Sequence, residues 1–111
     1  MTAHPSRRPV IYVCHPYAQE DPGENANLVR GICRALVAEG ALPIGPHIYL
    51  PQLVDDLAQR ELALSLCLQM VTFCDELRVY GDRISDGMRR EIDFASDQGI
   101  SVRHMNTEVR R

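Results

Sequence analysis

Four short apolar runs alternate with helix-like stretches along this chain, and this alternation constrains the fold more than any other feature of the sequence. The first run, 9–14, contains Val, Ile and Tyr without polar alternation, which is typical of a strand covered on both faces. The other runs are 41–44, 76–80 and 100–104. Pro43 in the second run indicates a strand at or near a sheet edge.

The stretches between these runs carry apolar residues at helical spacing. The predicted helices are 25–39, 58–74 and 86–98, and Gly40 and Gly99 end the first and the last. Residues 45–56 are expected to form a loop with one helical turn. The predicted order β-α-β-α-β-α-β indicates an α/β fold, a flavodoxin/Rossmann-like three-layer sandwich with a short parallel sheet of four to five strands. In such sheets ligands bind at the carboxyl ends of the strands.

Length and composition predict one ordinary globular domain. The 111 residues are 45% hydrophobic and 24% charged, without the polar bias of disordered chains. We expect the domain to span 9–105, between a flexible N-terminal tail, 1–8, and a C-terminal tail, 106–111.

The charge pattern argues against nucleic acid and membrane partners. The net charge is −3, and the twelve arginines are mostly scattered rather than gathered on one face. No apolar run is long enough for a membrane span or for a secretory leader, so a cytoplasmic location is expected. The four cysteines form no C-x-x-C pair and stand among apolar neighbours, which predicts reduced, buried thiols and no metal site.

The predicted helix 58–74 is apolar around most of its circumference. Such a helix needs cover on more than one side, and in a small chain a second subunit is one source of that cover. We therefore expect a homo-oligomer, a dimer or larger, formed through this helix. A purely structural assembly subunit that uses the same helix is a further reading.

Glu91 is the most informative polar residue, because it shares the buried stripe of its helix with Met88, Ile92 and Ala95. The positions four residues away are Gly87 and Ala95, which cannot form an ion pair with it. Glu91 therefore points inward or across a cleft, near a helix start whose dipole would help to keep it ionised. It is a candidate nucleophile or base, or else an internally hydrogen-bonded structural residue.

The start of the same helix carries Asp86 and Gly87. Asp86 is either the N-cap of the helix or a functional carboxylate, and it is also spaced to form a surface ion pair with Arg90. Gly87 removes a side chain at the first turn, which would let a ligand approach the backbone N–H groups. The dinucleotide, P-loop and serine-hydrolase motifs are absent from the sequence.

Polar and aromatic residues follow the first strand, where a cleft should open. These are Tyr12, His15, Pro16 and Tyr17. His47 follows the second strand in a similar position. A buried tyrosine and solvated loop histidines explain these residues as well as a ligand site does.

Four segments carry a family resemblance: I-Y-V-C-H-P-Y at 11–17, G-x-x-P-x-x-P-H-I-Y-L-P at 40–51, C-D-E-L-x-V-Y-G at 74–81 and S-D-G-M-x-x-E-I-x-x-A at 85–95. Together they resemble the nucleoside 2-deoxyribosyltransferase-like superfamily, and more closely its small bacterial and phage branch. The resemblance covers about 9–102, and D-G-x-x-x-E is its most specific piece.

The resemblance implies cleavage or transfer of the N-glycosidic bond of a nucleoside or nucleotide, by a deoxyribosyltransferase or an N-hydrolase. Glu91 would attack the anomeric carbon, Asp86 would help proton transfer or sugar binding, and Tyr12 would steady Glu91. No cofactor and no metal are implied. The substrate-binding residues would be His15, Pro16, Tyr17, Asn25, His47, Ser85, Gly87 and Met88.

Two departures from the family pattern keep a second reading open. The transferases have another aspartate on the helix before the third strand, where this chain offers only Glu61 and Asp75. They also take a polar residue from a partner's C-terminal tail, where Asn106 is the nearest amide here. The alternative is a nucleotide-binding or sensing module of the same fold with weak or no catalysis. A phosphate could be bound by Ser85, by Arg83 or by 25–26, and the sequence does not choose among them.

Overall fold

The computed structural model describes residues 7–16, 22–55 and 58–105, so Tyr17 and Asn106 lie outside the described residues. Four strands, three α-helices and two short 3₁₀-helices follow one another in the described ranges. They are β1 (Val10–Cys14), α1 (Pro22–Ala38), β2 (Leu42–Ile44), η1 (Pro46–Ile48), η2 (Leu50–Gln52), α2 (Arg60–Val71), β3 (Glu76–Val79), α3 (Asp86–Asp97) and β4 (Ser101–His104).

The four strands form one parallel sheet with the order β2-β1-β3-β4. The predicted strands and their parallel arrangement are thus confirmed. β2 lies at the edge, where the sequence placed it, and an edge position tolerates Pro43 because a proline cannot donate a ladder hydrogen bond. Tyr12 of β1 lies opposite Ile44 of β2 and Leu77 of β3, so β1 is an inner strand.

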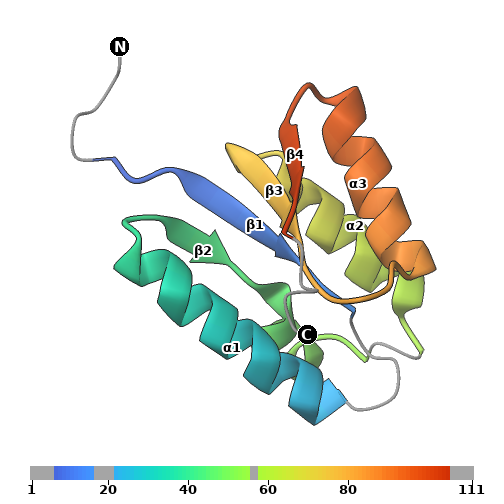
Figure 1. Cartoon of the computed structure of the whole chain (residues 1–111). Helices are drawn as coiled ribbons and strands as arrows, with labels where there is room; N and C mark the ends of the chain where they lie inside the picture. The colour runs from blue at the N-terminus through green and yellow to red at the C-terminus, as the bar shows by residue number, and fades with distance from the viewer. Residues whose placement is uncertain (1–6, 17–21, 56–57, 106–111) are drawn as a thin grey trace.

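Helices cover both faces of this sheet, α1 on one side and α2 with α3 on the other (Figure 1). The alternation of β1 produces the two layers, because successive side chains of a strand point to opposite faces. Ile11 and Val13 pack with residues of α1, whereas Tyr12 and Cys14 pack with residues of α2 and α3. The predicted three-layer α/β sandwich is confirmed.

Two helices differ in length from the prediction. α1 begins at Pro22, three residues earlier than predicted, because proline fits the first helical position, where its missing N–H is not needed. α2 covers only Arg60–Val71, within the predicted 58–74, because Thr72, Phe73 and Cys74 bond back in a tighter turn. The loop between β2 and α2 contains two 3₁₀-turns, one more than expected.

None of the helices in the described part of the chain is long and apolar enough to cross a membrane.

The strand order places a topological switch point between β1 and β3. From β1 the chain moves outward to β2, and it then returns past β1 to form β3 and β4 on the other side. The connections that leave the carboxyl ends of β1 and β3 therefore diverge, and a crevice opens between them. His15 follows β1 directly, and Ser85 precedes α3 after β3.

Candidate functional site

A cavity of about 420 Å³ lies at this switch point, and its volume is within the range of small-molecule sites. It is built from the residue that follows β1, from η1, from the first two turns of α2 and from the start of α3. Its lining residues are His15, His47, Arg60, Ala63, Leu64, Cys67, Ser85, Asp86, Gly87, Met88, Arg89, Arg90 and Glu91.

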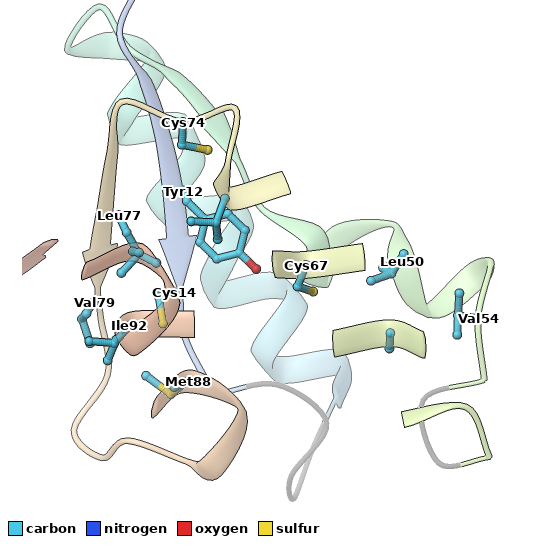
Figure 2. Packing of buried hydrophobic residues seen from close by; sticks show 13 residues of the cluster. Tyr12, Cys14, Leu50, Val54, Cys67, Cys74, Leu77, Val79, Met88 and Ile92 are labelled. Atoms are coloured by element: carbon cyan, nitrogen blue, oxygen red, sulfur yellow. The ribbon is translucent and has the colours of Figure 1, made fainter. Parts of the chain in front are cut away.

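Glu91 forms part of the inner wall, where its side chain is buried. The Tyr12 hydroxyl donates a hydrogen bond to Glu91 Oε2 at 2.9 Å, and the Cys14 thiol donates to Oε1 at 3.3 Å. Tyr12 and Cys14 are two residues apart on β1 and so share one face of the sheet. Figure 2 shows the Tyr12 hydroxyl oxygen directed toward Cys67 of α2. Both carboxyl oxygens of Glu91 therefore accept hydrogen bonds from side chains of β1.

Burial governs the protonation of this carboxyl group. It raises the pKa of Glu91 from 4.5 to about 7, while hydrogen bonds from Tyr12, Cys14 and Cys67 act in the opposite direction. The sequence predicted that the helix dipole would help to keep Glu91 ionised, but desolvation has the larger effect on its pKa. Glu91 is the sixth residue of α3, beyond the first turn where the dipole acts, so desolvation prevails. At neutral pH the group is divided between its neutral and ionised forms.

The residues that hold Glu91 remain donors across this pH range. Burial raises the pKa of Tyr12 and of Cys14 well above their ordinary values, and the nearby Glu91 charge adds to both effects. Protonated hydroxyl and thiol groups can therefore donate to the carboxylate when it ionises.

The start of α3 differs from the prediction, because Ser85 and not Asp86 is the N-cap. Ser85 Oγ accepts a hydrogen bond from the Met88 backbone N–H at 3.2 Å. Asp86 is the first helical residue, and its exposed side chain lines the cavity. The predicted partner of Asp86 is also different, since Arg90 pairs with Glu61 of α2 at 3.3 Å. Gly87 leaves open space, because a Cβ there would meet nothing within 4 Å.

The two histidines form a buried pair at the cavity wall, so the reading of solvated loop residues is wrong. His47 Nε2 donates to the His15 backbone carbonyl at 2.8 Å, and His15 Nδ1 donates to the Pro16 carbonyl at 3.0 Å. Their rings meet edge to face, with centroids 5.8 Å apart. Burial lowers the pKa of His47 to about 4 and also lowers the pKa of His15. Both rings are therefore neutral near pH 7.

The structure brings most of the predicted site residues together, but not all of them. Ser85, Gly87 and Met88 line the cavity with Asp86 and Glu91. Tyr12 is outside the lining and donates its hydroxyl hydrogen bond to Glu91. Pro16 is buried beside Gly81, where a Cβ would meet its ring at 2.9 Å, and it is not among the lining residues. Asn25 is on α1, also outside the lining.

Sequence reasoning missed several residues of the site. Cys14 and Cys67 were expected only as core thiols, although Cys14 follows Tyr12 by two residues and so had to share its face. The arginines of the lining also went unnoticed, because Arg60 is separated from Arg89 and Arg90 by some thirty residues. The prediction of buried thiols is wrong for Cys33, which is only half-buried.

The two carboxylates that the sequence offers near the position of the missing helix aspartate have other partners. Glu61 pairs with Arg90, as described, and Asp75 Oδ2 accepts from the Val10 backbone N–H at 2.7 Å. Val10 begins β1, so Asp75 lies at the amino ends of the strands, whereas the cavity lies at their carboxyl ends. All four cysteines are free, and no three His, Cys, Asp or Glu residues gather as a metal site within the described ranges.

Fold and site together define an α/β domain with a cavity of about 420 Å³ at the carboxyl ends of the strands of a parallel sheet, and with a buried carboxyl group in the cavity wall. The chain belongs to the family described as "Domain of unknown function (DUF7768)", which it matches over residues 9–105. A comparison with curated proteins found no match.

Proposed function

We propose that this protein cleaves or transfers the N-glycosidic bond of a nucleoside or nucleotide through a covalent intermediate on Glu91. The observation that carries the proposal is the setting of Glu91, a buried carboxyl group that faces a cavity while Tyr12 and Cys14 hold its two oxygens. A nucleophile held in this way keeps one orientation toward a bound sugar. The D-G-x-x-x-E motif that resembles the deoxyribosyltransferases ends at this residue.

The proposed reaction has two displacement steps. A Glu91 carboxylate oxygen bonds to C1′ of the sugar as the bond from C1′ to the base nitrogen breaks and its electron pair leaves with the base. Asp86, which lines the cavity, is placed to pass a proton to the departing base. Water then attacks C1′ while Asp86 takes one of its protons, and the bond from C1′ to Glu91 breaks with its electron pair returning to the carboxylate, which gives free base and free sugar. A second base in place of water would give transfer.

The electrostatics of the site support a nucleophilic role for Glu91. A desolvated carboxylate is more reactive than a hydrated one, and the pKa of about 7 caused by burial leaves a substantial ionised fraction at neutral pH. Since the ionised form attacks, the rate of base release should rise with pH through this value. Tyr12, which acts through Glu91 without facing the cavity, is a positioning residue.

A second candidate is a nucleotide-binding or sensing module, and the α2 wall of the cavity favours it. Besides Arg60, α2 contributes Ala63, Leu64 and Cys67 to the lining, so this wall offers no carboxylate among the described residues. A site with one fewer acid would bind the same ligands and turn them over slowly or not at all.

The test is to incubate purified protein with a panel of deoxynucleosides and their 5′-monophosphates and to follow the release or exchange of free base by chromatography. Glu91→Gln should abolish release, because an amide is a poor nucleophile. Asp97→Asn is a matched control, since Asp97 is an exposed residue of α3 outside the cavity lining. Release that persists in Glu91→Gln would contradict the mechanism, and nucleotide binding without any release would support the binding module.

A further inference from the structure

Three arginines stand at the cavity, and the catalytic proposal makes no use of them. Arg60 is the first residue of α2, whereas Arg89 and Arg90 lie on the first two turns of α3, just before Glu91. All three side chains are exposed, while Glu91 is buried. The cavity is therefore lined by a carboxyl group at its inner wall and by guanidinium groups toward solvent.

The charge of this lining is opposite in sign to that of the whole chain. The chain carries −3, whereas the lining presents three guanidinium groups against one exposed carboxylate, Asp86, and the partly protonated Glu91. The histidine pair adds no charge near pH 7, because burial lowers the pKa of both rings. An acidic protein that gathers cations at one cavity favours anionic ligands there.

The three arginines also differ in whether they already form an ion pair. Arg90 of α3 already forms an exposed ion pair with Glu61 of α2. Within the described ranges the side chains of Arg60 and Arg89 make no ion pair and remain available to a ligand. A guanidinium group presents a planar set of donors that matches the oxygens of a phosphate.

We infer that Arg60, Arg89 and Arg90 form an anion site and that the ligand is a nucleoside 5′-monophosphate rather than an unphosphorylated nucleoside. The nucleoside part of this inference rests on the proposed function. The anionic part rests on the arginines alone. The phosphate lies toward the solvent side of the cavity, with the sugar turned inward toward Glu91.

This assignment differs from the phosphate sites that the sequence suggested. Arg83 and Asn25 are not among the residues that line the cavity. Ser85 does line it, but its hydroxyl already caps α3 through the Met88 N–H. The start of α3 still contributes, because the partial positive charge of a helix N-terminus reinforces the guanidinium groups.

The experiment compares matched ligand pairs by isothermal titration calorimetry. Each deoxynucleoside and its 5′-monophosphate is titrated into the full chain, both wild type and carrying Glu91→Gln to prevent turnover. The same titrations are made with Arg60→Gln/Arg89→Gln and with Arg34→Gln, a control on an exposed residue of α1 far from the cavity lining. Inorganic phosphate is titrated alone as the free-anion probe, and thermal unfolding verifies that each variant is folded.

We expect the monophosphate to bind about tenfold more tightly than the nucleoside or better, with a preference that weakens at high salt. The double variant should lose this preference, and Arg34→Gln should retain it. Equal affinities for both members of every pair, or a preference unchanged in the double variant, would overturn the inference. So would inorganic phosphate that binds as tightly as the monophosphate, because the site would then serve a free anion.

The same data separate this inference from the proposed function. A phosphate preference that depends on Arg60 and Arg89, without base release from any substrate, would leave the anion site standing and remove the enzyme. Base release at equal rates from nucleosides and monophosphates, unaffected by the arginine substitutions, would do the reverse.

Discussion

The carboxyl group of Glu91 is buried where an apolar side chain would ordinarily pack, and its neighbours supply what burial removes. Solvent is replaced by a hydroxyl donor at 2.9 Å and a thiol donor at 3.3 Å. The thiol of Cys67 adds a third hydrogen bond that lowers the pKa of Glu91. These donors moderate the desolvation without cancelling it, which leaves the group poised near neutral pH.

Replacing Tyr12 by Phe should make Glu91 harder to ionise. The substitution removes the hydroxyl that favours the charged form, so the pKa of Glu91 should rise further above about 7. The midpoint of the pH profile of base release should move upward with it, and the free energy of unfolding should fall by about 1 kcal/mol. Tyr49→Phe, at an exposed tyrosine, is the control. An unshifted midpoint would show that Tyr12 does not tune Glu91.

Glu91→Gln should change how stability depends on pH. Because the folded-state pKa of Glu91 is raised from 4.5 to about 7, the folded protein binds more protons than the unfolded chain between these values. Wild-type stability therefore carries a contribution that is full below pH 4.5 and is lost as the pH rises to 7. Glu91→Gln lacks this loss, so its stability relative to wild type should increase over that interval, on the order of 3 kcal/mol.

Urea unfolding of both proteins at several pH values measures this difference. His47 acts in the opposite direction, since its lowered pKa of about 4 makes folding more favourable as the pH rises toward 6.5. That contribution is common to both proteins and cancels in the comparison. A difference that stays constant with pH would mean that Glu91 titrates normally.

Among the helices and strands, α3 contributes the most residues to the cavity lining. The residue at which α3 begins determines which way each of these side chains faces. Ser85 and Asp86 are adjacent and both are good N-cap residues, so the pattern alone could not choose between them. The structure begins the helix one residue earlier than an Asp86 cap would require. Asp86 is thereby released from the capping role and lines the cavity.

Ser85→Ala should therefore cost about 1 kcal/mol of unfolding free energy, because it leaves the Met88 N–H without its cap. Asp86→Ala should lower the free energy of unfolding by less, since the Asp86 side chain is exposed and stabilises the helix only through its interaction with the helix dipole. Chemical denaturation of the two variants provides the comparison. The opposite order would restore Asp86 as the cap.

The helices and strands, and their order along the chain, could be predicted from the sequence because apolar periodicity reflects burial directly. It was less informative about the cavity, which depends on contacts between distant segments. His47 shows the difference, since its burial against His15 requires η1 to fold over the end of β1. Arg60 is similar, because the packing of α2 beside α3 brings it to Arg89 and Arg90.

For the whole molecule, the strand order determines where chemistry is possible. The connections that leave the carboxyl ends of β1 and β3 diverge, and the residues after each strand meet α2 and α3 around one cavity. The predicted alternation of strands and helices implied binding at that edge of the sheet. It could not specify the order β2-β1-β3-β4 or the residues that face each other across the crevice.

The expected homo-oligomer remains a prediction at this scale. Leu62 of α2 and Phe73, in the turn that follows α2, are 45% and 69% exposed, while Ser65 and Gln69 between them are polar and exposed. We expect a dimer or larger assembly through this face of α2, which Leu62→Glu should weaken. Sedimentation equilibrium at micromolar concentrations measures the mass. A wild-type monomer at every concentration would contradict the prediction.

The most direct test of the account is to trap the glycosyl intermediate on Glu91. A 2′-fluorinated deoxynucleoside, and its 5′-monophosphate, should slow both displacement steps because the fluorine disfavours the oxocarbenium-like transition state. With a good leaving group the intermediate should accumulate as an increase in intact mass equal to one sugar unit. Trypsin cuts after Arg90, so Glu91 begins the peptide 91–103, and fragmentation should locate the sugar on its first residue. Base release without an adduct, or an adduct on another residue, would contradict the central claim.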